Sequence, residues 1–179
     1  NCNAIIETST NTLRFGCKNS FIPNTVTALG TNAFLDMDII SVHIPQSVTS
    51  IGTKAFGGCS LLEQITVAQN NPVFDSRNNC NAIVETSTNK LVVGCKNTII
   101  PNTITTIGDY AFYNCEGLTS IVVPNSVTTL NQYAFAFCYH LISVGMSNSL
   151  TTIGNYAFES CFRLNSINIP NTVVTIGHW

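Results

Sequence analysis

The chain has 179 residues, of which only 9% are charged, and its formal net charge is -2 at neutral pH. Asn, Thr and Ser occur 22, 22 and 15 times, so amides and hydroxyls rather than ions hydrate the surface. With no basic patch, nothing favours binding to nucleic acid or to an anionic membrane. A hydrophobic content of 45% excludes general disorder, and no apolar run approaches the roughly 20 residues that span a bilayer. We therefore expect a folded, soluble chain.

The first predicted element is a β-hairpin at about residues 1–18. Two apolar runs flank a turn of Ser, Thr and Asn, which is the pattern of two antiparallel strands. If Glu7 pairs with Thr12, the same register places Cys2 opposite Cys17, within the range of a disulfide. A shift by one residue would send the two thiols to opposite faces and leave them free. The sequence leaves both outcomes open.

A repeat of 22 or 23 residues follows this hairpin. Its copies start at Pro23, Pro45, Pro101, Pro124, Ser147 and Pro170 and share the pattern I-P-N-[ST]-V-T-x-I-G-x-x-A-F-x-x-C-x-x-L-x-x-I-x-[IV]. Each copy predicts a short strand before the Pro and a β-branched strand after it. A Gly corner with positive φ and a helical or 3-10 turn at Ala-Phe-x-x-Cys should follow. Stacked copies would align their Phe and Leu side chains into apolar columns, which is the principle of a solenoid.

A second hairpin is predicted at about residues 70–97, where the repeat is interrupted. Residues 79–109 match residues 1–31 at 21 of 31 positions, so a period of 78 residues lies over the shorter one. The same choice between a disulfide and two free thiols therefore applies to Cys80 and Cys95.

The remaining cysteines give no sign of a metal site. Cys59, Cys115, Cys138 and Cys161 share one position of the repeat, and zinc sites need closely spaced ligand pairs that are missing here. We expect these four to be buried core thiols. The three His and nine acidic residues lie at unrelated positions, with no nucleophile elbow or phosphate loop. The sequence thus predicts no enzyme, no catalytic residue, no metal and no cofactor.

The repeated pattern, carried by residues 100–121 and 123–144, resembles the BspA-type leucine-rich repeat of bacterial surface proteins and some parasitic protists. The resemblance covers nearly the whole chain, and segment 70–83 is similar to a module that recurs in such proteins of gut Bacteroidetes. It implies an α/β repeat fold, a right-handed leucine-rich-repeat solenoid of short parallel strands and helical or 3-10 turns with about six coils. The resemblance also implies display on the cell surface or secretion, and adhesion without catalysis.

Two surfaces are candidates for binding. One is the outward face of the first strands, the usual recognition face of leucine-rich repeats, which here is small and polar. It comprises Ser41, His43, Gln64, Thr66, Ser120, Val122, Ser143, Gly145, Ser166 and Asn168. The other is an aromatic strip of the kind that marks interfaces, formed where equivalent positions around the Phe/Cys turns stack. It comprises Tyr110, Tyr113, Tyr133, Phe137, Tyr139, Tyr156, Phe162 and Arg163. The alternatives are a merely solvated sheet and rings that only cover coil ends.

The repeat is incomplete at both ends, because residues 177–179 align with 108–110 and no counterpart of 70–78 precedes residue 1. We expect residues 1–179 to be one solenoid domain, a fragment of a longer chain whose uncapped ends could self-associate, with any signal peptide outside it. The predicted function is adhesion to a protein, such as a host matrix or cell-surface protein. The alternatives are a spacer or stalk without a ligand and a carbohydrate-binding surface.

Overall fold

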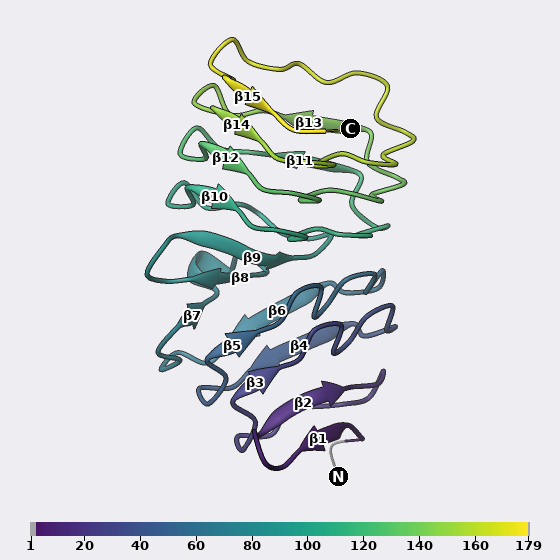
Figure 1. Cartoon of the computed structure of the whole chain (residues 1–179), viewed down its shortest axis with the longest axis vertical. Helices are drawn as coiled ribbons and strands as arrows, with labels where there is room; N and C mark the ends of the chain where they lie inside the picture. The colour runs from purple at the N-terminus through teal and green to yellow at the C-terminus, as the bar shows by residue number, and fades with distance from the viewer. Residues whose placement is uncertain (1–2, 179) are drawn as a thin grey trace.

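The computed structural model describes residues 3–178, which form an elongated stack of coils with the two termini at opposite ends (Figure 1). The described residues contain fifteen short strands and one 3-10 helix. They are β1 (Ile5–Glu7), β2 (Thr12–Phe15), β3 (Ala28–Leu29), β4 (Ser41–Ile44), β5 (Ser50–Ile51), β6 (Gln64–Val67), β7 (Phe74–Asp75), η1 (Arg77–Asn79), β8 (Ala82–Glu85), β9 (Lys90–Gly94), β10 (Thr106–Ile107), β11 (Ser120–Val122), β12 (Thr129–Leu130), β13 (Ser143–Gly145), β14 (Thr152–Ile153) and β15 (Thr175–Ile176).

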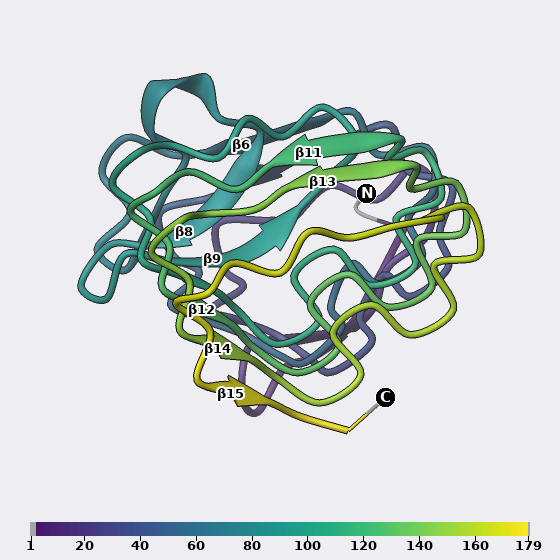
Figure 2. The ribbon, with the colours of Figure 1, turned by 90° about the horizontal axis from the view of Figure 1, so that it is seen from above.

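The strands build two walls. One wall holds two sheets, with the strand orders β1-β2-β3-β5 and β15-β14-β12-β10-β9-β8-β7. In these sheets β1-β2, β7-β8 and β8-β9 pair antiparallel, whereas the two-residue strands of the repeats pair in parallel. Their register joins equivalent residues of neighbouring repeats, such as Thr106 with Thr129. The opposite wall holds the parallel pairs β4-β6 and β11-β13. Seen from above, the coils superpose around a shared interior, as Figure 2 shows. The predicted solenoid is therefore confirmed.

The Ala-Phe-x-x-Cys segment forms hydrogen-bonded turns, not the helical or 3-10 turn expected from the sequence. Within one coil the Tyr113 N–H donates to the Tyr110 carbonyl at 3.1 Å. The Phe112 N–H instead donates to the Ala134 carbonyl of the next coil at 2.8 Å. A helix needs consecutive N–H groups bonded within its own segment, whereas here alternate N–H groups donate to the neighbouring coil.

The corner glycines have a different role from the predicted one. Gly108 and Gly154 do not have positive φ. A Cβ atom on Gly108 would lie 2.8 Å from the Leu91 carbonyl oxygen of the preceding coil. Glycine is therefore needed for close stacking of the backbones. The left-handed backbone lies two residues later, with φ of 58° at Tyr110 and 57° at Tyr156.

The hairpin of β8 and β9 divides the apolar interior into two cores. Ala82, Val84 and Leu91 pack into the core on its C-terminal side, whereas Ile83 and Val93 pack into the core on its N-terminal side. β8 alternates in this way because successive side chains of a strand point to opposite faces, whereas in β9 both Val92 and Val93 pack on the N-terminal side. The hairpin is thus a partition inside the stack, paired in parallel with β10 on the wall.

A bulge in this hairpin separates Cys80 from Cys95. The pairing of Glu85 with Lys90 matches the predicted register, but the register shifts at Val92, which has no direct partner. As a result Cys80 belongs to the C-terminal core and Cys95 to the N-terminal core, and both are free thiols. Of the two alternatives that the sequence left open, the structure therefore has two free thiols at Cys80 and Cys95, because one extra residue turns the second thiol to the other face.

The first hairpin has the same design. Glu7 pairs with Thr12, and a bulge follows toward the strand ends. The Cys17 thiol lies 3.1 Å from the Asn3 carbonyl oxygen, to which it donates. Cys2 lies outside the described residues, so the pairing of Cys2 with Cys17 stays a prediction.

Candidate functional site

The aromatic strip begins with a column of tyrosines on successive coils. The rings of Tyr110 and Tyr133 stack with centroids 4.9 Å apart, and those of Tyr133 and Tyr156 stack 5.0 Å apart. Each ring follows the corner of its coil, so the parallel pairing of β10, β12 and β14 sets the spacing. The column presents ring edges and hydroxyl groups to solvent.

A second row of rings lies beside this column. Tyr113 meets Phe137 edge to face at 5.3 Å, and Phe137 meets Tyr139 at 6.1 Å. Tyr139 stacks on Phe162 at 5.6 Å, and Phe162 is 77% exposed. Arg163 is also exposed and follows Phe162 directly. All residues of the predicted aromatic strip therefore lie together along one edge of the C-terminal coils.

The backbone of this edge has an uncommon conformation. Tyr110, Tyr133, Tyr156 and Phe137 all have positive φ, between 55° and 62°. This left-handed region disfavours residues with a Cβ atom, by about 1–2 kcal/mol each. Hydrogen bonds between coils hold this backbone conformation; for example, the Tyr133 N–H donates to the Asn155 carbonyl at 2.9 Å.

Lys54 extends the aromatic strip toward the N-terminal coils, which the sequence alone did not suggest. Its ammonium group lies 4.6 Å from the ring centre of Tyr110 and 4.2 Å from that of Tyr113. Such cation–π contacts contribute about 0.5–2 kcal/mol. The available signal was the repeat position, because Lys54 occupies the place before Ala that holds Tyr110 in the later copy.

Both tyrosines at this contact are neutral near physiological pH. Burial raises the pKa of the Tyr110 phenol, and the nearby Asp109 carboxylate raises it further. Burial also raises the pKa of the Tyr113 phenol, with a smaller contribution from Asp36. The aromatic strip thus carries hydroxyl donors and apolar rings, with positive charge only at Lys54 and Arg163 on its borders.

The first-strand wall is the other predicted surface. Its outward side chains are exposed, and Val122 is 73% exposed. The His43 Nδ1 and the Thr66 hydroxyl lie within hydrogen-bond distance at 2.9 Å. This wall is not continuous, because β4-β6 and β11-β13 form separate sheets. Ser166 and Asn168 are exposed but lie outside any strand.

The four thiols at one repeat position form a column inside the stack. The Cys59, Cys138 and Cys161 thiols donate to the carbonyls of Phe34, Phe112 and Phe135 in the preceding coils, at 3.0, 3.1 and 3.1 Å. Cys59, Cys115 and Cys138 are buried, whereas Cys161 is only partly buried. Across the described chain, the Cys115 thiol donates to no acceptor.

Other classes of site find little support in the described part of the chain. Residues 3–178 contain no group of three or more His, Cys, Asp or Glu side chains placed to hold a metal ion. Nor does that range contain a helix with the length and apolar character needed to cross a bilayer.

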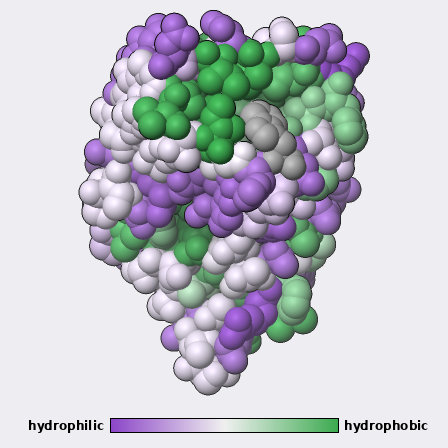
Figure 3. Space-filling view, turned by 45° about the horizontal axis from the view of Figure 1, so that its top comes forward, coloured by the Kyte–Doolittle hydropathy of each residue, from purple (hydrophilic) through white to green (hydrophobic). Residues whose placement is uncertain are grey.

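Apolar side chains gather at the end of the solenoid formed by the last coil, as the green surface in Figure 3 shows. Val174 is 86% exposed and Ile176 is 45% exposed there. This end face is the surface through which self-association was expected.

The solved structures most informative for comparison are bacterial leucine-rich proteins. A leucine-rich cell-surface protein from Faecalibacterium prausnitzii is 28% identical, with a TM-score of 0.73, over 92% of this chain and 46% of its own. The pneumococcal vaccine antigen PcpA is 18% identical, with a TM-score of 0.74, over 92% and 45%. A leucine-rich repeat protein from Bacteroides ovatus is 24% identical, with a TM-score of 0.50, over 85% and 43%. The last two show the fold alone.

This chain thus spans less than half the length of these solved proteins. Among curated proteins, no sequence matches it significantly. Residues 13–90 and 90–179 match the family described as the BspA type leucine rich repeat region (6 copies). The stacked coils and the repeat therefore lead to one conclusion: the chain belongs to the BspA-type leucine-rich repeat family.

Proposed function

We propose that the chain is part of a non-enzymatic bacterial cell-surface or secreted protein, and that it binds another protein through the aromatic strip. Membership of the family and the likeness to the Faecalibacterium prausnitzii cell-surface protein support the location. The single observation that carries the binding proposal is the row from Tyr113 to Phe162, which places an exposed ring and an arginine beside partly buried rings.

The aromatic strip has the composition of a protein interface. Residues that dominate binding energy at interfaces are enriched in Tyr, Trp and Arg and lie in packed surroundings. Tyr139 and Phe162 support each other by stacking, so little side-chain entropy would be lost on binding. The predicted residues of the first-strand wall are mostly Ser, Thr and Gln and include no Tyr, Trp or Arg.

A protein fits the aromatic strip better than a glycan does. Binding of sugars to aromatic side chains uses free ring faces. Here the two faces of Tyr133 are covered by Tyr110 and Tyr156, and Lys54 lies over Tyr110. At Tyr110 and Tyr133, ring edges and hydroxyls remain, which suit apolar and polar groups of a protein surface.

The test is binding of the purified chain to immobilised matrix proteins and to host cells. A variant with Phe137→Ser, Tyr139→Ser and Phe162→Ser should bind at least tenfold more weakly, because these rings supply the anchors. The matched control carries His43→Ser, Gln64→Ser and Val122→Ser on the first-strand wall and should bind as the unchanged chain does.

Each other outcome counts against the proposal in a specific way. If only the control variant loses binding, the partner binds the first-strand wall and not the aromatic strip. Saturable binding on a glycan array would favour the carbohydrate alternative. If no protein or cell binds, the chain acts as a spacer. Light scattering over a concentration range checks that association through Val174 and Ile176 at the end face does not imitate binding.

A further inference from the structure

One turn of the solenoid is missing between the coil that contains Phe56 and the coil that contains Phe112. β9 occupies the wall at Leu91, but the chain then reaches Cys95 without an Ala-Phe turn. Gly94 lies where that turn would be, and its N–H donates to the Ala111 carbonyl at 2.8 Å. A Cβ atom on Gly94 would lie 2.2 Å from the Phe112 ring.

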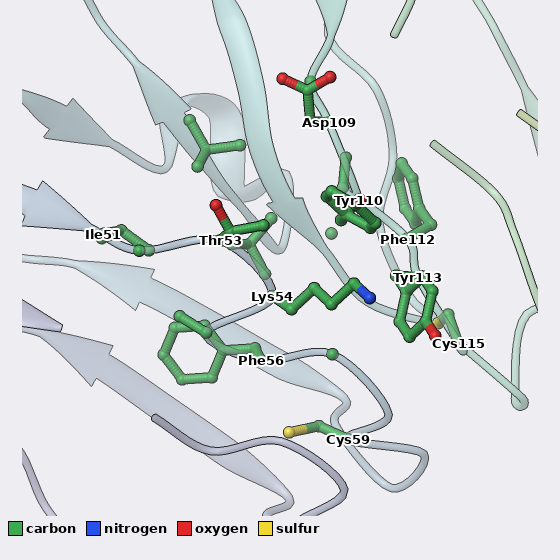
Figure 4. Close-up of a pocket in the computed structure, with 18 of the residues that line it drawn as sticks. Ile51, Thr53, Lys54, Phe56, Cys59, Asp109, Tyr110, Phe112, Tyr113 and Cys115 are labelled. Carbon is green, nitrogen blue, oxygen red and sulfur yellow. The ribbon is translucent and has the colours of Figure 1, made fainter. Parts of the chain in front are cut away.

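The missing turn leaves a cavity of about 160 Å³ between the two coils (Figure 4). Phe56 and Phe112 both line it, together with Val92, Cys59 and Cys115. The column of stacked phenyl rings stops on either side, because Phe56 stacks on Phe34 and Phe112 on Phe135. The cavity therefore lies at the only break of this column between Phe34 and Phe158 in the described residues.

Two backbone donors that line this cavity have lost their acceptors. In the coil before, the Asn32 and Phe34 N–H groups donate to the Thr53 and Ala55 carbonyls at 3.1 and 2.7 Å. The equivalent groups one coil later are the N–H groups of Lys54 and Phe56, and neither has an acceptor among residues 3–178. A buried N–H without a partner costs about 1–3 kcal/mol, so such groups generally find one.

The ammonium group of Lys54 adds a positive charge at the same place. The ion pairs of the described chain join other residues, among them Lys90 with Glu85 at 3.0 Å, and none includes Lys54. Figure 4 shows the Lys54 side chain running along the cavity toward Tyr113, while the carboxylate of Asp109, which also lines the cavity, points away from Lys54. Positive charge and free N–H donors next to apolar walls are complementary to an anion that carries an apolar group.

We propose that this cavity binds a small arylcarboxylate. The aromatic ring lies between Phe56 and Phe112, since cavities of about 150 Å³ hold a benzene-sized group. The carboxylate accepts the N–H groups of Lys54 and Phe56 and pairs with the Lys54 ammonium. This site shares Lys54, Tyr110 and Tyr113 with the aromatic strip, but it does not depend on the proposed binding of a protein partner.

The test is an NMR titration of the ¹⁵N-labelled chain with phenylacetate. We expect saturable shifts of the Lys54 and Phe56 amide signals, with a dissociation constant on the order of 1 mM or tighter. Acetate lacks the ring and benzyl alcohol lacks the charge, so each should bind at least about tenfold more weakly. If water alone fills the cavity, phenylacetate gives no saturable shift, and the proposal is overturned.

Two variants test the site, and a third serves as a control for the loss of a positive charge elsewhere. Val92→Phe places a phenyl ring in the cavity and should abolish binding. Lys54→Met keeps the length of the side chain but removes its charge, and it should weaken binding about tenfold. Lys18→Met removes a charge at an exposed position of the first hairpin and should change nothing. Unchanged affinity in Lys54→Met, or equal losses in both lysine variants, would overturn the proposal.

Discussion

The coils from β10 to β15 stack without interruption, whereas the coils on either side of β9 are separated by one missing turn. In the uninterrupted stack the Phe112 and Phe135 N–H groups donate to the next coil at 2.8 Å each, and the Cys138 thiol donates to the Phe112 carbonyl. At the interrupted junction the Phe56 N–H and the Cys115 thiol lack such partners within residues 3–178.

At this junction the wall is interrupted as well as the turn, because β5 ends one sheet and β9 belongs to the other. β9 keeps the wall register, with Lys90 beside Thr106 and Leu91 beside Ile107. Near the outer end of the turn, one hydrogen bond still joins the two coils: the Gly58 N–H donates to the Tyr113 carbonyl at 3.2 Å. The omission leaves one cavity and two backbone donors without acceptors among residues 3–178.

Loss of a phenyl ring should cost more in the uninterrupted stack than at the junction. Phe135 is fully buried between Phe112 at 4.9 Å and Phe158 at 5.4 Å, so Phe135→Ala should lower the free energy of unfolding by about 3–5 kcal/mol. Phe56 stacks only on Phe34, and Phe56→Ala should cost about 1 kcal/mol less. Urea denaturation measures both variants, and equal losses would contradict the comparison.

A methyl group on Gly94 should disturb the junction. Gly94→Ala places its Cβ against the Phe112 ring, and overpacking of this kind typically costs about 1–3 kcal/mol. Gly145→Ala is the matched control, because its nearest neighbour would be a Val122 side-chain atom at 3.6 Å, an ordinary contact. Thermal denaturation should show a lower midpoint only for Gly94→Ala. A stable Gly94→Ala variant would mean that Phe112 moves freely into the cavity.

Replacing Cys by Ser should lower stability more at the junction than in the uninterrupted stack, by a smaller margin than the changes above. In Cys138→Ser the hydroxyl keeps the Phe112 carbonyl as acceptor. In Cys115→Ser a buried hydroxyl has no acceptor, so the loss of stability should be about 1–2 kcal/mol larger. Urea midpoints of the two variants give the difference, and a Cys115→Ser variant as stable as Cys138→Ser would reveal an acceptor in the cavity.

The smallest expected effect is on pH dependence. Burial raises the pKa of the Cys59 and Cys115 thiols from 9.0 to about 12. The folded state therefore keeps these protons where the unfolded chain releases them, so the stabilisation is complete below pH 9 and is lost as the pH rises from 9 toward 12. Each thiol accounts for about 0.4 kcal/mol at pH 9. Urea titrations from pH 7 to 9 should show this decline, and a Cys59→Ala, Cys115→Ala variant should show a smaller one.

Local patterns in the sequence predicted the repeating parts well. The alternation around Ile121 gave its inward direction, and the phase of Tyr110, Tyr133 and Tyr156 gave their column. Both depend on a periodicity that a solenoid copies directly into space. The role of the corner glycines was harder to predict. A glycine such as Gly108 can be required for close contact between backbones or for positive φ, and the sequence looks the same in both cases.

The sequence by itself determined the repeat length, the inward and outward faces of each coil and the position of the two hairpins, because these follow from period and polarity. Only the tertiary structure decided that Cys80 and Cys95 lie in different cores, because one bulged residue reverses a strand's faces without leaving a signal in composition. It also decided that Lys54 meets Tyr110 and Tyr113 across the cavity, since that contact joins segments more than fifty residues apart and exists only where a turn is missing.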